Sequence, residues 1–208
     1  LFQRAKDRGS KELYARVMEL FTAFCGLVFL GVIYYIDIIS LLLGRDFRSG
    51  VGVVPIMLFS YMILGMLFNV SMWYKLSGKT NMAIWITSAG LVVTLVVNLV
   101  FMPEYSYWAA AFGHLASYVT MFVLSAVLGQ KHWPIPYRWD RILGTLALMF
   151  LFYGVATMID TQLFHFAGWD TDRHLLRWKL GVHTVLLLGY LASAWALLRK
   201  GITAPVRD

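Results

Sequence analysis

Only a few ionisable side chains lie inside the long apolar stretches of this sequence, and any chemistry in those stretches would depend on them. Asp37 stands between two isoleucines, and His114 and His183 each lie within an apolar run. Burying an unpaired charge is costly, so groups of this kind commonly have a ligand or a partner. We expect Asp37 either to contact a polar ligand or an ion, or to pair with Arg45 or Arg48.

The histidines have two interpretations. His114 could bind hydroxyl groups or titrate near neutral pH, because imidazole changes its charge in that range. The alternative is a hydrogen bond between helices, which a histidine in such a place makes more often. The same two interpretations hold for His183, which lies in the last apolar run.

Amide and hydroxyl side chains recur at four-residue steps, so that they share a helical face. Tyr61, Gly65 and Asn69 form one such row, and Thr94 and Asn98 lie in another. An amide in an apolar surrounding needs a hydrogen-bond partner. Either a hydrated cavity or a neighbouring helix would provide that partner.

Ala109, Gly113 and Ser117 also follow one another at steps of four residues. Small side chains in such a row allow two helices to approach closely. We therefore interpret this row as a packing surface and not as a ligand site.

The longest polar segment runs from Asp160 to Lys179 and contains Asp170, Asp172 and His174. Side chains of these types bind metals, but the composition also suits an exposed loop. The sequence has no glycine-rich phosphate loop, no nucleophile elbow and no histidine pair spaced as in zinc helices. It therefore predicts no catalytic residue, no metal and no cofactor.

The elements that position these residues follow from the composition. The chain has 208 residues, of which 60% are hydrophobic and 14% charged. Soluble domains contain about 25% charged residues, and disordered chains contain few hydrophobic ones. A single cysteine, Cys25, excludes a disulfide framework within the chain. The composition thus predicts an integral membrane protein.

Six stretches are long enough for a transmembrane helix, and none alternates as a β-barrel strand does. They are Tyr14–Leu43, Val53–Tyr74, Met82–Met102, Tyr107–Leu128, Ile142–Ile159 and Leu180–Leu198. We expect an all-α integral membrane bundle of six transmembrane helices. Residues 14–129 would form a four-helix part and residues 142–198 two additional helices. Cytoplasmic loops would occupy residues 1–13 and 130–141, and a cytoplasmic tail residues 199–208.

The orientation follows from the basic residues. Most of the 18 Lys and Arg residues fall on one predicted side of the membrane. The opposite side receives only Arg45, Arg48, Arg173, Arg177 and Lys179. Since positive charge accumulates on the cytoplasmic side, both ends of the chain are predicted to be cytoplasmic.

Four segments together form a pattern that is typical of one protein family. They are Val53–Leu58, Leu67–Leu76, Val96–Pro103 and Ala109–Tyr118. They place one asparagine near the end of a span, a second before a proline at the end of the next span, and an Ala-rich helix start after it. This pattern resembles the C-terminal half of bacterial polysaccharide flippases. These are the O-antigen and capsule exporters of the multidrug/oligosaccharidyl-lipid/polysaccharide superfamily. Tyr105–Trp108 departs from the family's glycine-rich turn, and the last two spans match no family motif.

The resemblance implies a bundle similar to the C-terminal lobe of the MATE-like fold, with two lobes around a cavity that alternates in access. It implies three partners: a polyprenyl-pyrophosphate-linked oligosaccharide, membrane lipid and a missing N-terminal lobe of the same protein. It implies that nucleic acid is not a partner and that the protein lies in the bacterial inner membrane. The start at Leu1 without methionine fits a fragment, which we expect not to transport alone. The candidates for lining the cavity are Asp37, Tyr61, Asn69, Thr94, Asn98 and His114.

A pyrophosphate would be bound by Arg or Lys, and none lies in the middle of a span. The candidates at the cytoplasmic rim are therefore Arg16, Lys75 and Lys79. Arg16 has a simpler interpretation, a local pair with Glu19 three residues later. Basic residues in a cytoplasmic loop likewise need no ligand to explain them.

Two other functions stay open. A multidrug or cation antiporter of the same superfamily would have its coupling carboxylates mostly in the missing region. An integral-membrane glycosyl- or acyltransferase of envelope synthesis would need a cluster of carboxylates or histidines in a large loop. The asparagines favour the polysaccharide branch, and we expect a transporter and not an enzyme.

Overall fold

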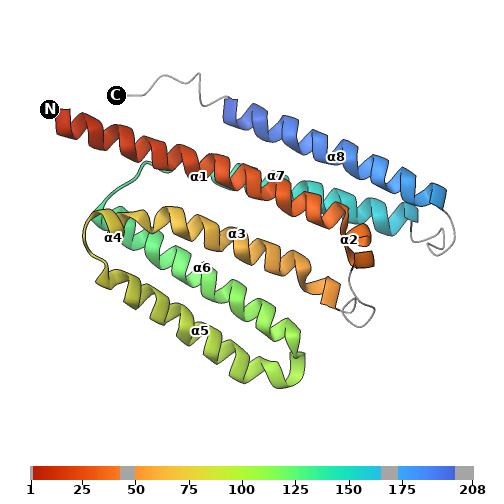
Figure 1. Cartoon of the computed structure of the whole chain (residues 1–208), viewed down its shortest axis with the longest axis horizontal. Coiled ribbons are helices and arrows are strands. Elements are labelled where there is room, and N and C mark those ends of the chain that lie inside the picture. The colour runs from red at the N-terminus through yellow and green to blue at the C-terminus, as the bar shows by residue number, and fades with distance from the viewer. Residues whose placement is uncertain (1, 43–49, 165–172, 200–208) are drawn as a thin grey trace. The chain divides into compact units, whose positions relative to one another are not determined.

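The computed structural model describes residues 2–42, 50–164 and 173–199, and within these ranges it contains helices and no strand. The elements in chain order are α1 (Phe2–Tyr34), α2 (Ile36–Leu42), α3 (Val54–Val70), α4 (Met72–Leu76), α5 (Asn81–Tyr105), α6 (Tyr107–His132), α7 (Trp139–Ile159), the π-helical turn η2 (Asp160–Phe164) and α8 (Arg173–Arg199) (Figure 1).

Six of the described segments are long and apolar enough to cross a membrane. They are Gly9–Tyr34, Gly50–Leu76, Asn81–Tyr105, Tyr107–His132, Trp139–Gln162 and Arg177–Arg199. The sequence-based expectation of an all-α chain with six candidate spans is thereby confirmed. In α5 only Ile86 and Gly90 are buried, while Leu99 is 77% exposed. Large exposed apolar side chains of this kind suit lipid contact, because water would not solvate them favourably.

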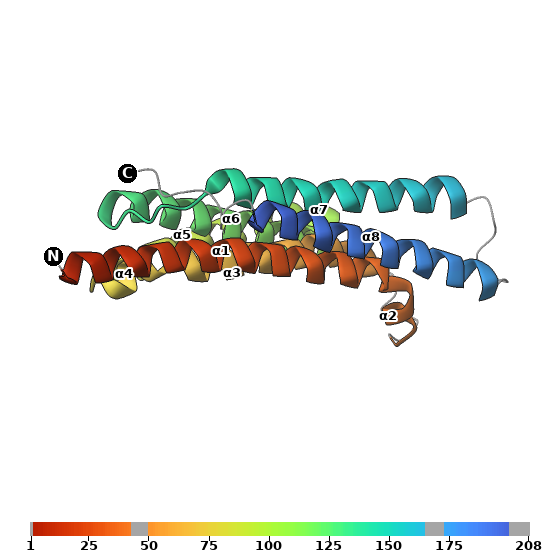
Figure 2. The same ribbon diagram turned by 90° about the horizontal axis from the view of Figure 1, so that it is seen from above.

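The helix boundaries correct three predictions from the sequence. Helix α1 begins at Phe2, so residues 2–13 are helical and not a loop. Polar composition indicated solvent exposure there, but Lys, Glu, Arg and Leu are also good helix formers. The first predicted span is broken at Tyr35, after which α2 turns away from the axis of α1 (Figure 2). The connection between α6 and α7 is shorter than predicted, because α6 continues to His132 and α7 begins at Trp139.

The chain divides into two compact units. Unit 1 contains residues up to 18 together with 46–137, and unit 2 contains residues 19–45 and 138–208. Helix α1 therefore contributes its first part to unit 1 and its second part to unit 2.

In unit 1, α6 lies between α3 and α5 and packs against both (Figure 1). The contact is made by buried, mostly small residues of α6 at four-residue steps: Ala109, Gly113, Ser117, Met121, Ser125 and Gly129. The Ser117 hydroxyl donates a hydrogen bond to the Gly90 carbonyl oxygen of α5 at 2.9 Å. The Trp73 indole donates to the Ser125 hydroxyl at 3.3 Å. The interpretation of this row as a packing surface is confirmed.

The turn between α5 and α6 is tight and strained. Its single linking residue, Ser106, has φ +48° and ψ −127°, a region that favours glycine. The Ser106 N–H donates to the Met102 carbonyl oxygen at 2.9 Å, which closes the end of α5. Serine thus occupies a conformation that glycine adopts more easily.

In unit 2, α7 packs against α8, and residues 19–34 of α1 are hydrogen-bonded to both helices. The Tyr190 hydroxyl of α8 donates to the Ala23 carbonyl oxygen at 3.1 Å, and the Tyr34 hydroxyl donates to the Phe152 carbonyl oxygen at 3.0 Å. Leu30 and Met149 are fully buried in this core. These contacts hold the ends of α1, α7 and α8 where ionisable side chains gather.

Candidate functional site

A cluster of four ionisable side chains lies in unit 2, and we call Asp37, Asp160, Lys179 and His183 the ionic cluster. Its centre is Lys179, whose side chain is 10% exposed. The Lys179 ammonium nitrogen lies 2.7 Å from Asp37 Oδ2 and 3.3 Å from Asp160 Oδ2. The side chains of Asp160 and Asp37 are 32% and 50% exposed. The lysine is therefore the bridge between two carboxylates that face water to different extents.

His183 is the most deeply buried member, with 2% of its side chain exposed. Its Nε2 lies 3.2 Å from Asp160 Oδ1. Its Nδ1 lies 3.1 Å from the Tyr34 carbonyl oxygen, and the two rings stack with their centroids 4.8 Å apart. Tyr34 thus fixes both the position and the plane of the imidazole.

Three separate elements and a helix end position the cluster. Lys179 and His183 are four residues apart on α8 and share one face of it. Asp160 is the first residue of the π-helical turn that follows α7. Asp37 lies on α2, which follows the break at Tyr35. The hydroxyls of Tyr35 and Thr184 are 2.7 Å apart, which ties the end of α1 to α8 beside the cluster.

Asp160, Lys179 and His183 lie inside candidate membrane spans, and Asp37 lies just beyond one. Ionisable side chains in such segments are rare and commonly mark ion or proton pathways. Two carboxylates and one ammonium leave a net charge of −1 when His183 is neutral. Protonation of the imidazole would make the cluster neutral.

Sequence reasoning found this site only in part. It named Asp37 and, with less weight, His183, but it assigned Asp160 and Lys179 to a loop. The structure begins α8 at Arg173, so Lys179 is helical and stands one turn before His183. The four-residue spacing of a lysine and a histidine was the available signal. Asp37 pairs with Lys179, and its expected partners Arg45 and Arg48 lie outside the described residues.

In unit 1 the amide of Asn69 is hydrogen-bonded on both sides. Its nitrogen donates to the Tyr14 carbonyl oxygen at 3.3 Å, and its oxygen accepts from the Tyr137 hydroxyl at 3.1 Å. Burial raises the pKa of Tyr137 well above its ordinary value, so the phenol remains a neutral donor. These bonds match the helix-to-helix interpretation of Asn69.

Asn98 and Thr94 lie where α5 meets α6. The Asn98 carbonyl oxygen is buried and has no hydrogen-bond partner among the described residues. A Cβ atom added to Gly113 would stand 3.0 Å from it, so the amide fills space beside that glycine. The Thr94 hydroxyl donates to the Gly90 carbonyl oxygen of its own helix at 3.1 Å. The Asn98 side chain therefore takes part in packing between helices, while the hydrogen bond of Thr94 stays within α5.

Three ring side chains lie next to one another in unit 1, and we call Tyr61, His114 and Tyr118 the aromatic row. The Tyr61 ring on α3 lies 6.4 Å from the Tyr118 ring on α6, and the His114 ring lies 5.7 Å from Tyr118. Tyr61 is 55% exposed, while His114 and Tyr118 are half-buried. Two predicted candidates, Tyr61 and His114, are thus brought together through Tyr118, which was not predicted.

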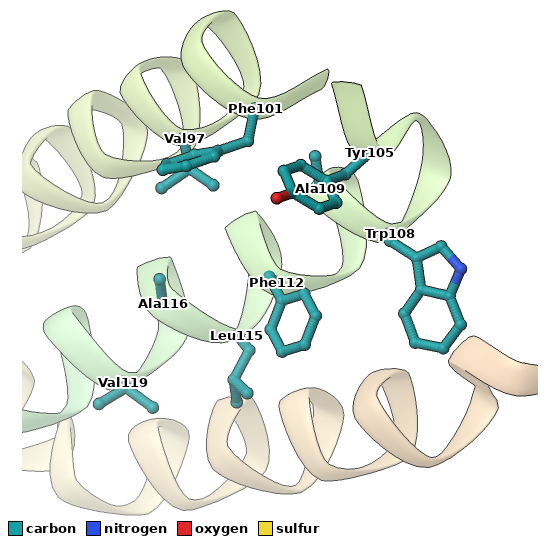
Figure 3. Close-up of a pocket in the computed structure, with 9 residues that line it drawn as sticks. All are labelled: Val97, Phe101, Tyr105, Trp108, Ala109, Phe112, Leu115, Ala116 and Val119. Atoms are coloured by element: carbon teal, nitrogen blue, oxygen red, sulfur yellow. The ribbon is translucent and has the colours of Figure 1, made fainter. Parts of the chain in front are cut away.

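A cavity of about 800 Å³ lies beside α5 and α6 in unit 1 (Figure 3). Its wall is apolar and includes Val97 and Phe101 of α5 together with Trp108 and Phe112 of α6. None of its nine lining residues is a candidate from the sequence. Figure 3 shows the rings of Phe101, Tyr105 and Phe112 around the opening, a surface suited to hydrocarbon and not to sugar hydroxyls.

The three predicted rim residues, Arg16, Lys75 and Lys79, have exposed side chains. The Lys75 ammonium lies 5.8 Å from the centre of the Phe68 ring. The local pair of Arg16 with Glu19 was wrong, because the described ion pairs of Glu19 are with residues of α7 and its preceding loop. They are Arg141 at 3.4 Å and Arg138 at 3.9 Å. Glu19 is buried, and the nearer arginine compensates its charge across helices.

The possible metal ligands Asp170, Asp172 and His174 cannot be placed: the first two lie outside the described residues, and the side chain of the third is not described. Among the described residues, no group of three or more His, Cys, Asp or Glu side chains has the geometry to hold a metal ion.

Comparison with known proteins identified no relative. No family model, curated protein or solved structure matches the chain.

Proposed function

We propose that this chain is part of a membrane transporter that moves a polyprenyl-pyrophosphate-linked oligosaccharide across the bacterial inner membrane. The single observation that supports transport is the ionic cluster, in which charged side chains from two candidate membrane spans and from α2 meet around the buried Lys179 and His183. Buried charges of this kind add little stability, and ionisable groups inside membrane spans commonly mark the pathway of ions or substrate.

The choice of substrate rests on the sequence resemblance between Val53 and Tyr137. The aromatic row offers a place for this substrate, since an exposed ring with hydroxyl and imidazole groups beside it can contact a sugar. Tyr61 would supply the exposed ring and His114 a hydrogen-bonding group. Asn69 would act indirectly, by holding Tyr14 and Tyr137 in place.

The test uses the full-length protein that contains this chain, reconstituted into lipid vesicles. A fluorescent polyprenyl-pyrophosphate disaccharide is added, and a membrane-impermeant glycosidase reports how much sugar faces outward. We expect protein-dependent movement of the sugar between leaflets. Tyr61→Ala should reduce the rate about tenfold, the loss of roughly 1.4 kcal/mol of contact energy. The matched control is Trp85→Ala, an exposed aromatic residue of α5 outside the row, which should retain the rate.

Two results would contradict the proposal in different ways. Absence of sugar movement with the wild-type protein would reject the oligosaccharide as substrate. Movement that Tyr61→Ala and Trp85→Ala leave equally unchanged would reject the aromatic row as the place of contact.

A second candidate is a cation or drug antiporter, and the two carboxylates held by Lys179 are the observation that favours it. The same vesicles distinguish the two functions. An antiporter would exchange a fluorescent organic cation for protons and would leave the labelled disaccharide where it was added.

A further inference from the structure

The hydrogen atom on one ring nitrogen of His183 is fixed by its neighbour. Nδ1 lies 3.1 Å from the Tyr34 carbonyl oxygen, which can only accept a hydrogen bond. Nδ1 must therefore be the donor, and the neutral ring would carry its hydrogen there. Nε2 would then have a lone pair and no hydrogen.

The other ring nitrogen faces a carboxylate. Nε2 lies 3.2 Å from Asp160 Oδ1, and neither atom has another hydrogen-bond partner among the described residues. An ionised carboxylate can only accept hydrogen bonds. If the ring were neutral and Asp160 ionised, Nε2 and Oδ1 would be two acceptors that face each other at a buried position. One additional proton removes the conflict, whichever of the two atoms carries it.

We propose that His183 and Asp160 bind one proton between them, and that this proton drives the transport cycle. Only the statement that the proton drives transport rests on the proposed function; the statement that the pair binds a proton does not. The charged and titratable groups around His183, among the described residues, are Asp160 from η2, Lys179 from α8 and Tyr34 from α1, with Asp37 of α2 behind Lys179. With the proton bound, the ionic cluster carries no net charge.

The geometry favours a proton over a metal cation. The Lys179 ammonium already occupies Oδ2 of both carboxylates, at 2.7 and 3.3 Å. A metal ion at the remaining oxygen of Asp160 would stand beside that positive charge, and among the described residues no group of three or more His, Cys, Asp or Glu side chains could hold it. A proton needs no further ligand.

The binding step is simple in its balance. A hydronium ion gives up a proton by breaking one of its O–H bonds and becomes water, and one N–H or O–H bond forms in the pair. No bond of the protein breaks and no electron is transferred. Release of the proton leaves two acceptors 3.2 Å apart, so the pair must separate or admit water. Since Asp160 and His183 belong to η2 and α8, proton release would move these elements apart or open the space between them to water, and either change links the proton to a conformational cycle.

The first measurement is nuclear magnetic resonance of the full-length protein in lipid nanodiscs with ¹⁵N-labelled histidine. We expect the Nε2 signal of His183 to show the shared proton near neutral pH. In Asp160→Asn the new amide can donate to Nε2, so the shared proton is no longer required and its signal should disappear. A wild-type Nε2 that lacks the proton beside an ionised Asp160 would overturn the proposal, and this measurement needs no variant to fold.

The second measurement is movement of the fluorescent disaccharide under a gradient of one pH unit. Each coupled proton permits up to about a tenfold change in the accumulation ratio. The wild type should respond to the gradient, and His183→Gln should lose that response. The control His132→Gln changes an exposed histidine at the end of α6 and should keep it.

The outcomes separate this inference from the proposed function. Movement of the disaccharide that ignores the gradient rejects proton coupling and leaves the function standing. No movement in any condition rejects the function, while the resonance measurement still decides whether the pair binds a proton.

Discussion

Among single residues, Lys179 should affect stability clearly, because it balances two carboxylates at once. Removing one partner from a buried ionic pair leaves an uncompensated charge, which costs about 3–5 kcal/mol when burial is complete. Asp160 and Asp37 are partly exposed, so water will reduce that cost. We expect Lys179→Met to lower the free energy of unfolding by about 2 kcal/mol.

Denaturant titration of the protein in detergent micelles measures this effect. The control Arg177→Met removes an exposed positive charge from the same helix and should change stability by less than about 0.5 kcal/mol. Equal midpoints for Lys179→Met and Arg177→Met would show that Lys179 does not compensate the two carboxylates.

Residue types and spacing predicted the candidates better than their partners. Asn69 was recognised as an amide that needs a partner, but Tyr14 and Tyr137 lie far from it in sequence and share no period with it. Asp37 was recognised as an ionisable group in an apolar stretch, while its partner Lys179 was assigned to a loop. Periodicity reports which face of a helix is apolar, and it contains no information about which other helix meets that face.

At the scale of elements, the contact between α5 and α6 depends on a glycine. A Cβ atom added to Gly90 would lie 2.6 Å from Met121 Sδ and 2.9 Å from the Ser117 hydroxyl oxygen, so these side chains would have to move. We expect Gly90→Ala to destabilise the protein by about 1–3 kcal/mol, the usual cost of overpacking. Thermal unfolding in lipid nanodiscs measures it.

The matched control is Gly154→Ala on α7, where an added Cβ meets nothing within 4 Å. Alanine has the better helix propensity, so this variant should be unchanged or more stable by up to about 1 kcal/mol. A Gly90→Ala protein as stable as Gly154→Ala would mean that α5 and α6 are not in close contact.

The turn between α5 and α6 should gain stability from a glycine. Ser106 adopts φ +48°, and such conformations cost non-glycine residues about 1–3 kcal/mol. We expect Ser106→Gly to raise the melting temperature, with a gain of about 1 kcal/mol after the greater freedom of glycine in the unfolded chain is included.

The control for this turn is Ser77→Gly. Ser77 lies in the turn after α4 with φ −86°, a conformation that serine adopts without strain. Its replacement should bring no gain. A lower melting temperature for Ser106→Gly than for Ser77→Gly would contradict the strain at Ser106.

At the scale of the whole molecule, hydropathy was sufficient to predict helical structure and the number of candidate membrane spans. The six apolar stretches correspond to six candidate spans, because a chain in lipid must satisfy its backbone hydrogen bonds internally. Helix ends and breaks were predicted less well. The start of α1 is mostly polar, so hydropathy does not mark it as part of the helix. The break at Tyr35 lies inside a mostly apolar stretch, so hydropathy does not mark it either.

The predicted orientation can be tested with single cysteines in a variant that carries Cys25→Ala. Lys79→Cys and Lys131→Cys lie at exposed positions that the basic residues assign to the cytoplasm, and Glu104→Cys lies at the opposite ends of the spans. A membrane-impermeant maleimide should label Glu104→Cys in intact cells. It should label the other two only in inverted vesicles.

Labelling of Lys79→Cys and Glu104→Cys from the same side would contradict a spanning α5. Labelling of all three from the reverse sides would keep the six spans and invert the orientation.

The spacing of the small residues on α6 has a further consequence. A step of four residues exceeds the 3.6 residues of a helical turn, so the row rotates by about 40° at each step. Gly113 and Ser117 therefore meet α5, whereas Ser125 and Gly129 meet Trp73 of α4. One inserted residue between Ser117 and Ser125 would rotate the later part by about 100° and remove it from Trp73. The number of residues along α6 thus sets the phase between its two partners, independently of which small residues occupy the row.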